Sequence, residues 1–316
     1  MAASTPRPKA PAPSGVLIVD KPRGPTSHDV VARVRRALST RHVGHAGTLD
    51  PMATGVLVIA VGEATKLVPW LTADDKTYET TVRLGVETDT LDAEGTETSR
   101  APVPDELARA LRDGSGSPLL DAAVAVERAR TAQVPPAFSA IRVGGRRAHE
   151  LARAGRLEAD LPERPVEVRA LDVLGGRADD GVELVLRVAS TKGYFVRSLA
   201  RDLARGLGTV GHLTALRRVR SGAFTVDDAI ALDAVRPDAL IGVADAAARA
   251  LPVTVLDEEG VRAVSYGRRV APEQMTAAHP RPSAWLDRAS RLVAIGERGP
   301  DGWGRVLRGF PAPAGA

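Results

Sequence analysis

The chain has 316 residues, of which 44% are hydrophobic and 26% charged, and this ordinary globular composition excludes disorder of the whole chain. Lys and Arg total 43 against 39 Asp and Glu, so the net charge of +4 only modestly favours a polyanionic partner. The sequence contains no cysteine, which excludes disulfides and thiolate metal ligands.

The N-terminal residues are rich in Pro, Ala and Ser, and residues 1–13 are predicted to form a disordered tail. The apolar run from Val16 to Val19 predicts a buried strand. Thr26 to Asp29 offer N-caps for a helix, and Arg33, Arg35 and Arg36 fall outside its apolar face. That face would be formed by Val30, Val31, Val34 and Leu38. No segment has the apolar run of a signal peptide or a membrane span, so a cytoplasmic protein is expected.

The middle of the chain shows both strand-like and helix-like patterns. From Val196 onward leucines recur at helical spacing, and Arg201 and Arg205 lie roughly opposite them, which predicts an amphipathic helix with a basic back. Further helices are predicted over residues 101–111 and 119–130. Strands are predicted over residues 56–61, 78–86 and 182–188.

Short strand-like runs separated by Gly and Pro follow residue 251, at 252–256, 291–295 and 305–307. They predict a small, mostly β unit at the end of the chain. Because strands and helices mix irregularly before it, the pattern favours an α+β fold over a doubly wound parallel sheet.

Residues 44–55, GHAGTLDPMATG, place three glycines, a histidine and one carboxylate between a predicted helix and a predicted strand. A glycine-rich loop allows backbone to approach a ligand closely, and Pro51 restricts Asp50 to extended conformations. An Asp in a turn is nevertheless a cap or a turn residue more often than a catalyst. The residues of this loop alone therefore leave catalysis open.

The segment GHAGTLDPMATGVL resembles the signature loop of the TruB family of tRNA pseudouridine-55 synthases. Further motifs of that family follow in the right order: Val19-Asp20-Lys21-Pro22 with Gly24 and Thr26-Ser27, Lys76-x-Tyr78, Gln133 to Ala140, Lys192 to Arg197 and Leu216-Arg217-Arg218. The resemblance spans residues 15–225. It implies a pseudouridine synthase fold, with a mixed, largely antiparallel sheet flanked by helices in residues 14–250. It also implies a small PUA-like RNA-binding β domain in residues 251–316.

The resemblance further implies an isomerase that converts uridine 55 in the T loop of tRNA to pseudouridine without a cofactor. Asp50 would be the catalytic carboxylate, although attack on the sugar, attack on the base and initial proton abstraction all remain open. Arg197 would pair with Asp50 and hold it ionised, and its place at the end of a strand-like run favours that role. Tyr78 would stack on the uracil. The target base would have to leave its stack to be reached.

RNA contacts are implied at several other positions. His45 would occupy the space left by the flipped base, and Lys21 would support the floor of the active site. Residues 133–155, with a turn at Gly144-Gly145, match an insertion that grips RNA. Its phosphate-binding cations would be Arg142, Arg146 and Arg147, joined by Lys192. Leu199 and Leu216 would form pocket walls, with plain core packing as the alternative, and Phe195 stands where many relatives carry tyrosine.

The expected partner is the T arm of tRNA, and a monomer without an obligate protein partner or a membrane is expected. His42 and His45 lack a third ligand at a recognisable interval, so no metal site is expected. Residues 206–211 satisfy a dinucleotide-binding pattern, but they would end a helix where that pattern must open one, so a nicotinamide dehydrogenase is not expected. Asp50 has no partner carboxylate in the matched motifs, which argues against a glycosidase. A non-catalytic tRNA-binding or tRNA-folding protein remains the alternative, and assistance in tRNA folding is compatible with catalysis.

Overall fold

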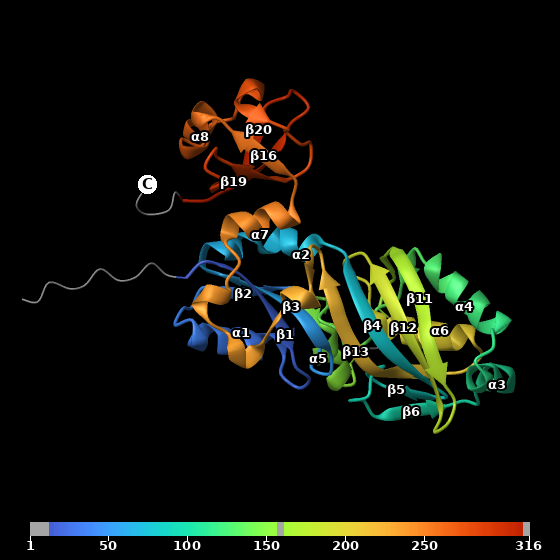
Figure 1. Cartoon of the computed structure of the whole chain (residues 1–316). Coiled ribbons are helices and arrows are strands. Elements are labelled where there is room, and N and C mark those ends of the chain that lie inside the picture. The colour runs from blue at the N-terminus through green and yellow to red at the C-terminus, as the bar shows by residue number, and fades with distance from the viewer. Residues whose placement is uncertain (1–12, 157–160, 312–316) are drawn as a thin grey trace, which may run out of the picture.

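The computed structural model describes residues 13–156 and 161–311. The predicted disordered tail lies outside this part of the chain except for its last residue. Figure 1 shows a long central sheet flanked by helices, with a smaller unit formed by the C-terminal part of the chain.

The large sheet has nine strands: β1 (Gly15–Lys21), β2 (Val43–Ala46), β3 (Thr54–Val61), β4 (Lys76–Leu84), β11 (Val168–Arg177), β12 (Val182–Ser190), β13 (Gly211–Ser221), β14 (Phe224–Thr225) and β15 (Ile230–Ala231). The smaller, five-stranded sheet contains β16 (Val253–Leu256), β17 (Met275–Thr276), β18 (Ser283–Leu286), β19 (Leu292–Arg298) and β20 (Gly304–Gly309). Short pairs join β5 (Val86–Thr88) to β6 (Glu97–Arg100), β7 (Ala132–Gln133) to β10 (Arg164–Pro165), and β8 (Arg142–Val143) to β9 (Arg146–Arg147). The α-helices are α1 (Ser27–Ala37), α2 (Val68–Ala73), α3 (Asp105–Asp113), α4 (Pro118–Arg128), α5 (Ala148–Arg153), α6 (Val196–Gly206), α7 (Val243–Ala250) and α8 (Glu258–Ser265).

The main path of the large sheet runs in the order β11-β12-β4-β13-β3-β1-β15. Strand β13 pairs with β3, and β1 with β15, in parallel, whereas the other neighbours in this sheet pair antiparallel. The predicted α+β fold with a mixed, largely antiparallel sheet is therefore confirmed.

Strands β1 and β3 are buried on both faces, which explains why they appear in the sequence as continuous apolar runs. Leu17 and Val19 point into one core cluster, and Val16 and Ile18 point into another. The first cluster contains residues of α1, α3, α4 and α6, and the second contains residues of α2 and α7. These central strands thus form a rigid base for the loop that joins β2 to β3.

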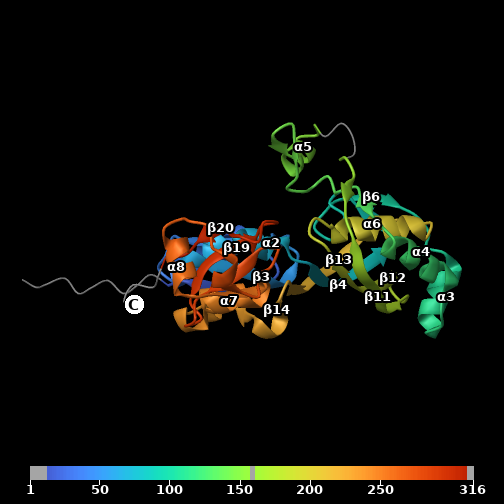
Figure 2. The ribbon, with the colours of Figure 1, turned by 90° about the horizontal axis from the view of Figure 1, so that it is seen from above.

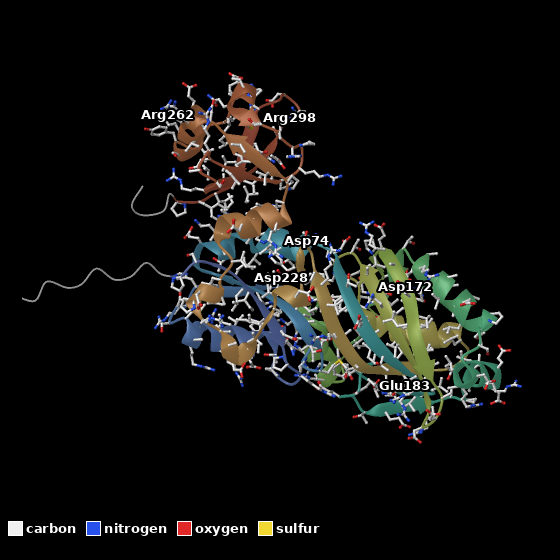
Figure 3. The ribbon with its side chains drawn as sticks, viewed as in Figure 1. Asp74, Asp172, Glu183, Asp228, Arg262 and Arg298 are labelled. Carbon is white, nitrogen blue, oxygen red and sulfur yellow. The ribbon has the colours of Figure 1, made fainter. Side chains whose placement is uncertain are left out.

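The second core cluster also contains Ala284, Leu286 and Ile295 from the smaller sheet. Consequently, the smaller sheet packs through α7 against a face of the large sheet and is not joined to it by a linker alone (Figure 1). Figure 3 shows Asp172 and Glu183 on the large sheet, and Arg262 and Arg298 on the C-terminal unit. The division at residue 250 and the likeness to a PUA domain stay predictions.

Several strand predictions need correction. Residues 44–55 are not a single loop, because β2 pairs antiparallel with β3 over Val43 to Ala46 and the connecting loop is confined to residues 47–53. Strand β11 was missed because it is an edge strand whose side chains are mostly exposed, so it lacks an apolar alternation. The predicted strand 78–86 begins earlier, at Lys76, and ends at Leu84, where Gly85 has a φ of 91°.

The predicted insertion at residues 133–155 contains β8, β9 and α5, and Figure 2 shows that α5 stands away from the central sheet. Gly144 and Gly145 both have positive φ, as a tight hairpin turn between β8 and β9 requires. None of the helices in residues 13–156 and 161–311 has both the length and the apolar character to cross a bilayer.

Gly55 lies on β3 between β1 and β13, where the backbone leaves no room for a side chain. It pairs with Lys21 and with Arg218, its φ is 97°, and an added Cβ would lie 2.2 Å from the Arg218 carbonyl oxygen. We predict that Gly55→Ala lowers the free energy of unfolding by about 2 kcal/mol more than Gly24→Ala. Gly24 has a similar φ of 107° but open space around it, so it measures the backbone strain alone. Urea titrations of both variants check this, and equal losses would contradict it.

Candidate active site

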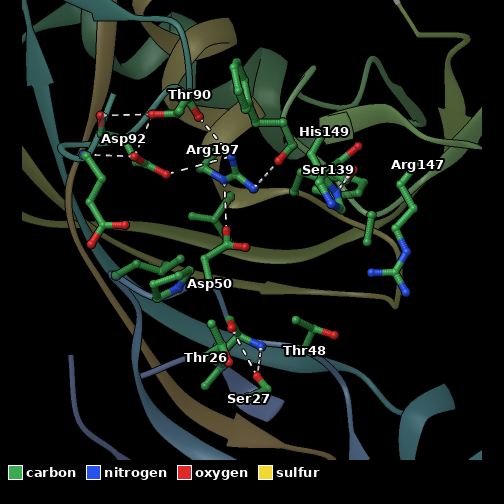
Figure 4. Close-up of a pocket in the computed structure, with 18 of the residues that line it drawn as sticks. Thr26, Ser27, Thr48, Asp50, Thr90, Asp92, Ser139, Arg147, His149 and Arg197 are labelled. Carbon is green, nitrogen blue, oxygen red and sulfur yellow. Dashed lines mark hydrogen bonds and ion pairs between the residues drawn. The ribbon is translucent and has the colours of Figure 1, made fainter. Parts of the chain in front are cut away.

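The loop at residues 47–53 carries Asp50 between β2 and β3 (Figure 4). The Ser27 hydroxyl, in the first turn of α1, accepts from the Leu49 amide at 2.9 Å and donates to the Leu49 carbonyl at 3.1 Å. The Ala53 amide donates to the Asp50 carbonyl at 3.1 Å and closes the turn. Thr26 caps α1 through its capping box with Asp29, which fixes the position of Ser27. The backbone on either side of Asp50 is therefore tied to the helix and to itself.

Two buried cations, Lys21 and Arg218, donate hydrogen bonds to backbone carbonyls in and around this loop from the core side. The Lys21 ammonium donates to the carbonyls of Pro22, Pro51 and Ala53 at 3.0, 3.1 and 2.7 Å. The Arg218 guanidinium donates to the carbonyls of Gly47, Thr48 and Val56. Lys21 is 0% exposed and Arg218 is 1% exposed, so both act on the loop from within the core. Lys21 thus lies under the floor of the site and does not line the cleft.

Burial has an electrostatic cost at Lys21. It lowers the pKa of the ammonium from 10.5 to about 8, although the nearby Asp50 carboxylate acts in the opposite direction. Lys76, which donates to the carbonyls of Thr72 and Asp74, has its pKa lowered to about 8 by burial and by Arg218. Lys21, Lys76 and Arg218 thus bring positive charge into the buried base of the site.

Arg197 joins the Asp50 loop to two other segments. Its Nε lies 2.9 Å from the Asp50 carboxylate, and its Nη1 and Nη2 donate to the carbonyls of Thr90 and Phe138, each at 2.9 Å. The Arg197 side chain is 7% exposed, whereas that of Asp50 is 36% exposed. Arg197 lies in the first turn of α6, and not at the end of a strand as the sequence suggested, because the preceding residues 191–195 form a turn.

The sequence did not single out the β5–β6 loop that contacts Arg197. The Asp92 carboxylate lies 3.8 Å from Nη1 of Arg197 and accepts from the Thr90 hydroxyl at 2.7 Å and the Glu94 amide at 3.0 Å. Leu91, between Thr90 and Asp92, has a φ of 61°, which is uncommon for a leucine. The polar run at residues 89–95, placed between two strands, is the signal that could have indicated a functional loop.

A cleft of about 690 Å³ opens above these residues. Asp50, Tyr78 and Arg197 all line it, so the structure brings the three predicted catalytic side chains to one place. Four further predicted residues line the same cleft: Phe195, Leu216, Arg142 and Arg147. Figure 4 shows Thr26 and Ser27 on one side of Asp50, and Ser139, Arg147 and His149 on another.

Other predicted residues lie outside the lining of the cleft. Leu199 is 0% exposed and packs in the core, which is the alternative kept for it. His45 lies on β2 with its ring centroid 5.4 Å from that of His28, a cleft residue, and burial lowers the pKa of His45. Arg146 and Lys192 are exposed.

Arg201 differs from its prediction as part of a basic, solvated helix back. It is 9% exposed and donates to the Val134 carbonyl and the Asp202 carboxylate at 2.9 and 2.8 Å. The segment that begins with Gln133 packs over this face of α6, and the Gln133 side chain bonds the Phe195 backbone in both directions. Arg201 therefore fixes the start of the insertion. The described residues contain no group of three or more His, Asp or Glu side chains placed to hold a metal ion.

Comparison with known proteins adds family information to this geometry. Residues 35–196 match the model of the TruB family pseudouridylate synthase N-terminal domain, and residues 197–257 match that of the tRNA pseudouridylate synthase B C-terminal domain. The tRNA pseudouridine synthase B of Corynebacterium aurimucosum is 43% identical over 285 residues, which cover 89% of this chain and 91% of that protein. That of Thermobifida fusca is 45% identical over 292 residues, which cover 90% and 94%. A chain in the crystal structure of a Cbf5-Nop10-Gar1 complex is 26% identical with a TM-score of 0.64, covering 90% of this chain and 78% of its own.

Replacement of Lys21 tests the support of the loop. We predict that Lys21→Met lowers the free energy of unfolding by roughly 2–3 kcal/mol, because three carbonyls lose their donor. Since the folded-state pKa of about 8 lies below the ordinary lysine pKa of 10.5, the unfolded chain binds more protons between these two pH values. Lys21 therefore adds stability as the pH rises from 8 to 10.5, and the difference between wild type and Lys21→Met should widen.

Urea titrations of both proteins at pH 7, 8, 9 and 10 measure this difference. Lys66→Met is the control, because Lys66 is a partly exposed residue paired with Glu63, and its loss should cost less than about 1 kcal/mol. A stability difference that stays constant or narrows above pH 8 would show that burial does not disfavour the charged form of Lys21.

Proposed function

The chain belongs to the TruB family of pseudouridylate synthases, and on this premise we propose that it isomerises uridine 55 in the T loop of tRNA, with Asp50 as the catalytic carboxylate. The observation that carries the proposal is the pairing of the partly exposed Asp50 with the buried Arg197 at 2.9 Å in a cleft that Tyr78 also lines. The relatives named tRNA pseudouridine synthase B support tRNA as the substrate.

The geometry supports a reaction carried by side chains of this chain. Conversion of uridine to pseudouridine breaks the bond between C1′ and N1, rotates the uracil and forms a bond between C1′ and C5. The C5 proton is lost to solvent and N1 ends protonated, so no redox partner is needed. A carboxylate can act as nucleophile, as leaving group or as base in this sequence. Arg197 would pair with the Asp50 carboxylate and aim it into the cleft.

The size of the cleft is consistent with a nucleotide taken out of its stack. Its volume of about 690 Å³ lies in the range of pockets that bind small organic molecules, roughly 300–1,000 Å³. A stacked base hides its glycosidic bond, and extraction is cheaper from a loop than from a duplex. Tyr78 would stack on the extracted uracil, and His45, next to His28 at the cleft, would enter the RNA.

The insertion would hold the RNA over the cleft. Arg142 and Arg147 line the cleft, Arg146 is exposed beside them, and all three lie on the β8–β9 hairpin. Guanidinium groups of this kind bind phosphates and position RNA without reading its bases. We propose that this chain acts as a monomer on the tRNA T arm. Assistance in tRNA folding by the same binding surface is compatible with this role.

The carboxylate assignment is tested by Asp50→Asn, which keeps the shape of the side chain but removes its charge and nucleophilicity. We predict that tRNA binding changes by less than about threefold while pseudouridine formation falls by more than about a thousandfold, because the variant retains the RNA surface and loses the reacting group. Binding is measured by filter retention, and turnover by tritium release from C5-labelled uridine. Asp113→Asn, at the exposed end of α3, is the control and should retain full turnover. Substantial turnover by Asp50→Asn would overturn the assignment.

The position of the modified uridine is a separate prediction. In total RNA from cells that lack this protein, tRNA should carry unmodified uridine at position 55, and re-expression of the wild type but not of Asp50→Asn should restore pseudouridine there. Pseudouridine-specific chemical mapping measures both. If position 55 remains modified and another uridine loses its modification, the predicted target position is wrong, but the assignment of pseudouridine synthesis to this protein holds. If no site changes, the non-catalytic tRNA-binding protein becomes the better interpretation.

A further inference from the structure

We propose that the exposed face of α1 that continues from the cleft binds phosphates of the RNA substrate through Arg35 and Arg36. This proposal rests on the proposed function, since it assigns a second contact to the same tRNA. We call this face the α1 strip and define it as His28, Arg35 and Arg36. It would grip the RNA on a different side of the cleft from the insertion, because Thr26 and Ser27, at the start of α1, lie on a different side of Asp50 from Arg147 (Figure 4).

The helix geometry places the strip beside the cleft. His28, the second residue of α1, lines the cleft, whereas Val30, Val31 and Val34 are buried in the core. At 3.6 residues per turn, Arg35 lies about 20° around the helix axis from His28, and Arg36 lies about 80° from it. The strip runs roughly 12 Å along the axis, from the edge of the cleft toward the end of the helix.

The two arginines of the strip are available to an anion. Both are exposed, and the Arg35 guanidinium donates to the Val43 carbonyl of β2 at 3.0 Å, which orients it next to the strand that carries His45. Among the residues that the structure describes, neither Arg35 nor Arg36 forms an ion pair with a carboxylate. The acidic residue of the first turn, Asp29, is engaged in the capping box with Thr26.

Two arginines on strands of the large sheet, in contrast, are paired with carboxylates. Arg187 pairs with Glu79 at 2.5 Å and Arg217 pairs with Asp20 at 2.8 Å, so their charges are locally neutralised. Charge on the α1 strip is not balanced in this way. A guanidinium matches the geometry of a phosphate, and unpaired cations on a surface that continues from a cleft for RNA increase both affinity and the rate of encounter. The charge complementarity favours an RNA backbone as the occupant.

The experiment compares two double variants of the full chain. Arg35→Gln/Arg36→Gln removes the charge of the strip, and Arg109→Gln/Arg112→Gln removes two charges from the exposed side of α3, another short helix. Glutamine has nearly the same helix propensity as arginine, so both helices should persist. Binding of an unmodified tRNA transcript is measured over a series of salt concentrations, and turnover by tritium release.

We expect the α1 variant to bind tRNA roughly tenfold more weakly than the wild type at moderate salt. We also expect its plot of log affinity against log salt to be shallower by about 1.4–1.8, because two phosphate contacts are lost. Turnover at saturating tRNA should stay close to the wild-type value, so that the loss appears in KM. The α3 variant should match the wild type in all three measurements.

The proposal is overturned if the α1 variant keeps the wild-type salt dependence, or if the α3 variant loses as much affinity as the α1 variant. Arg35→Lys/Arg36→Lys guards against a folding artefact, since it keeps both charges and should restore most of the affinity. Equal losses in the Lys and Gln pairs would also overturn it. A wild-type protein that binds tRNA through the strip but releases no tritium would defeat the proposed function and leave the α1 strip intact.

Discussion

Hydrogen bonds from two buried cations to backbone carbonyls hold the loop that presents Asp50, and the rest of the site depends on them. The carbonyls of residues 47–56 that turn inward cannot all be paired within the sheet, and buried carbonyls without donors are costly. Lys21 and Arg218 supply those donors from β1 and β13. The lowered pKa of Lys21 shows that burying the charge opposes this arrangement. The loop geometry is therefore maintained against an electrostatic cost, which is typical of a functional position.

Arg197 connects the parts of the site that are far apart in the chain. It contacts Asp50 on the β2–β3 loop, Thr90 and Asp92 on the β5–β6 loop, and Phe138 at the start of the insertion. Its contacts to Thr90 and Phe138 do not involve Asp50, so they hold the guanidinium independently of the carboxylate. The same contacts link the position of the insertion at residues 133–155 to the orientation of Asp50. Under the proposed function, RNA recognition and chemistry would share this one buried side chain.

The sequence by itself determined the local features and the family. The apolar runs at Val16–Val19 and Val56–Val61 predicted the two central strands, because strands buried on both faces are mostly apolar. The N-cap candidates from Thr26 to Asp29 predicted the start of α1, because an N-cap side chain bonds the backbone only two or three residues further on. The motif around Asp50 and Pro51, with Tyr78 and Arg197, indicated the family and the candidate site. Each of these signals lies within a few residues of the feature that it predicts.

Only the tertiary structure decided which side chains meet and which are buried. Arg201 looked like a solvated helix residue, but it is 9% exposed and donates to the Val134 carbonyl, and the contact of Asp92 with Arg197 became evident only in the fold. Strand β2 was hidden in an apparent loop because its pairing partner, β3, follows later in the chain. From the sequence, Leu199 could form a pocket wall or part of the core, and the packing of α6 places it in the core. Burial and partner choice depend on segments distant in sequence, and no local pattern of residues encodes that juxtaposition.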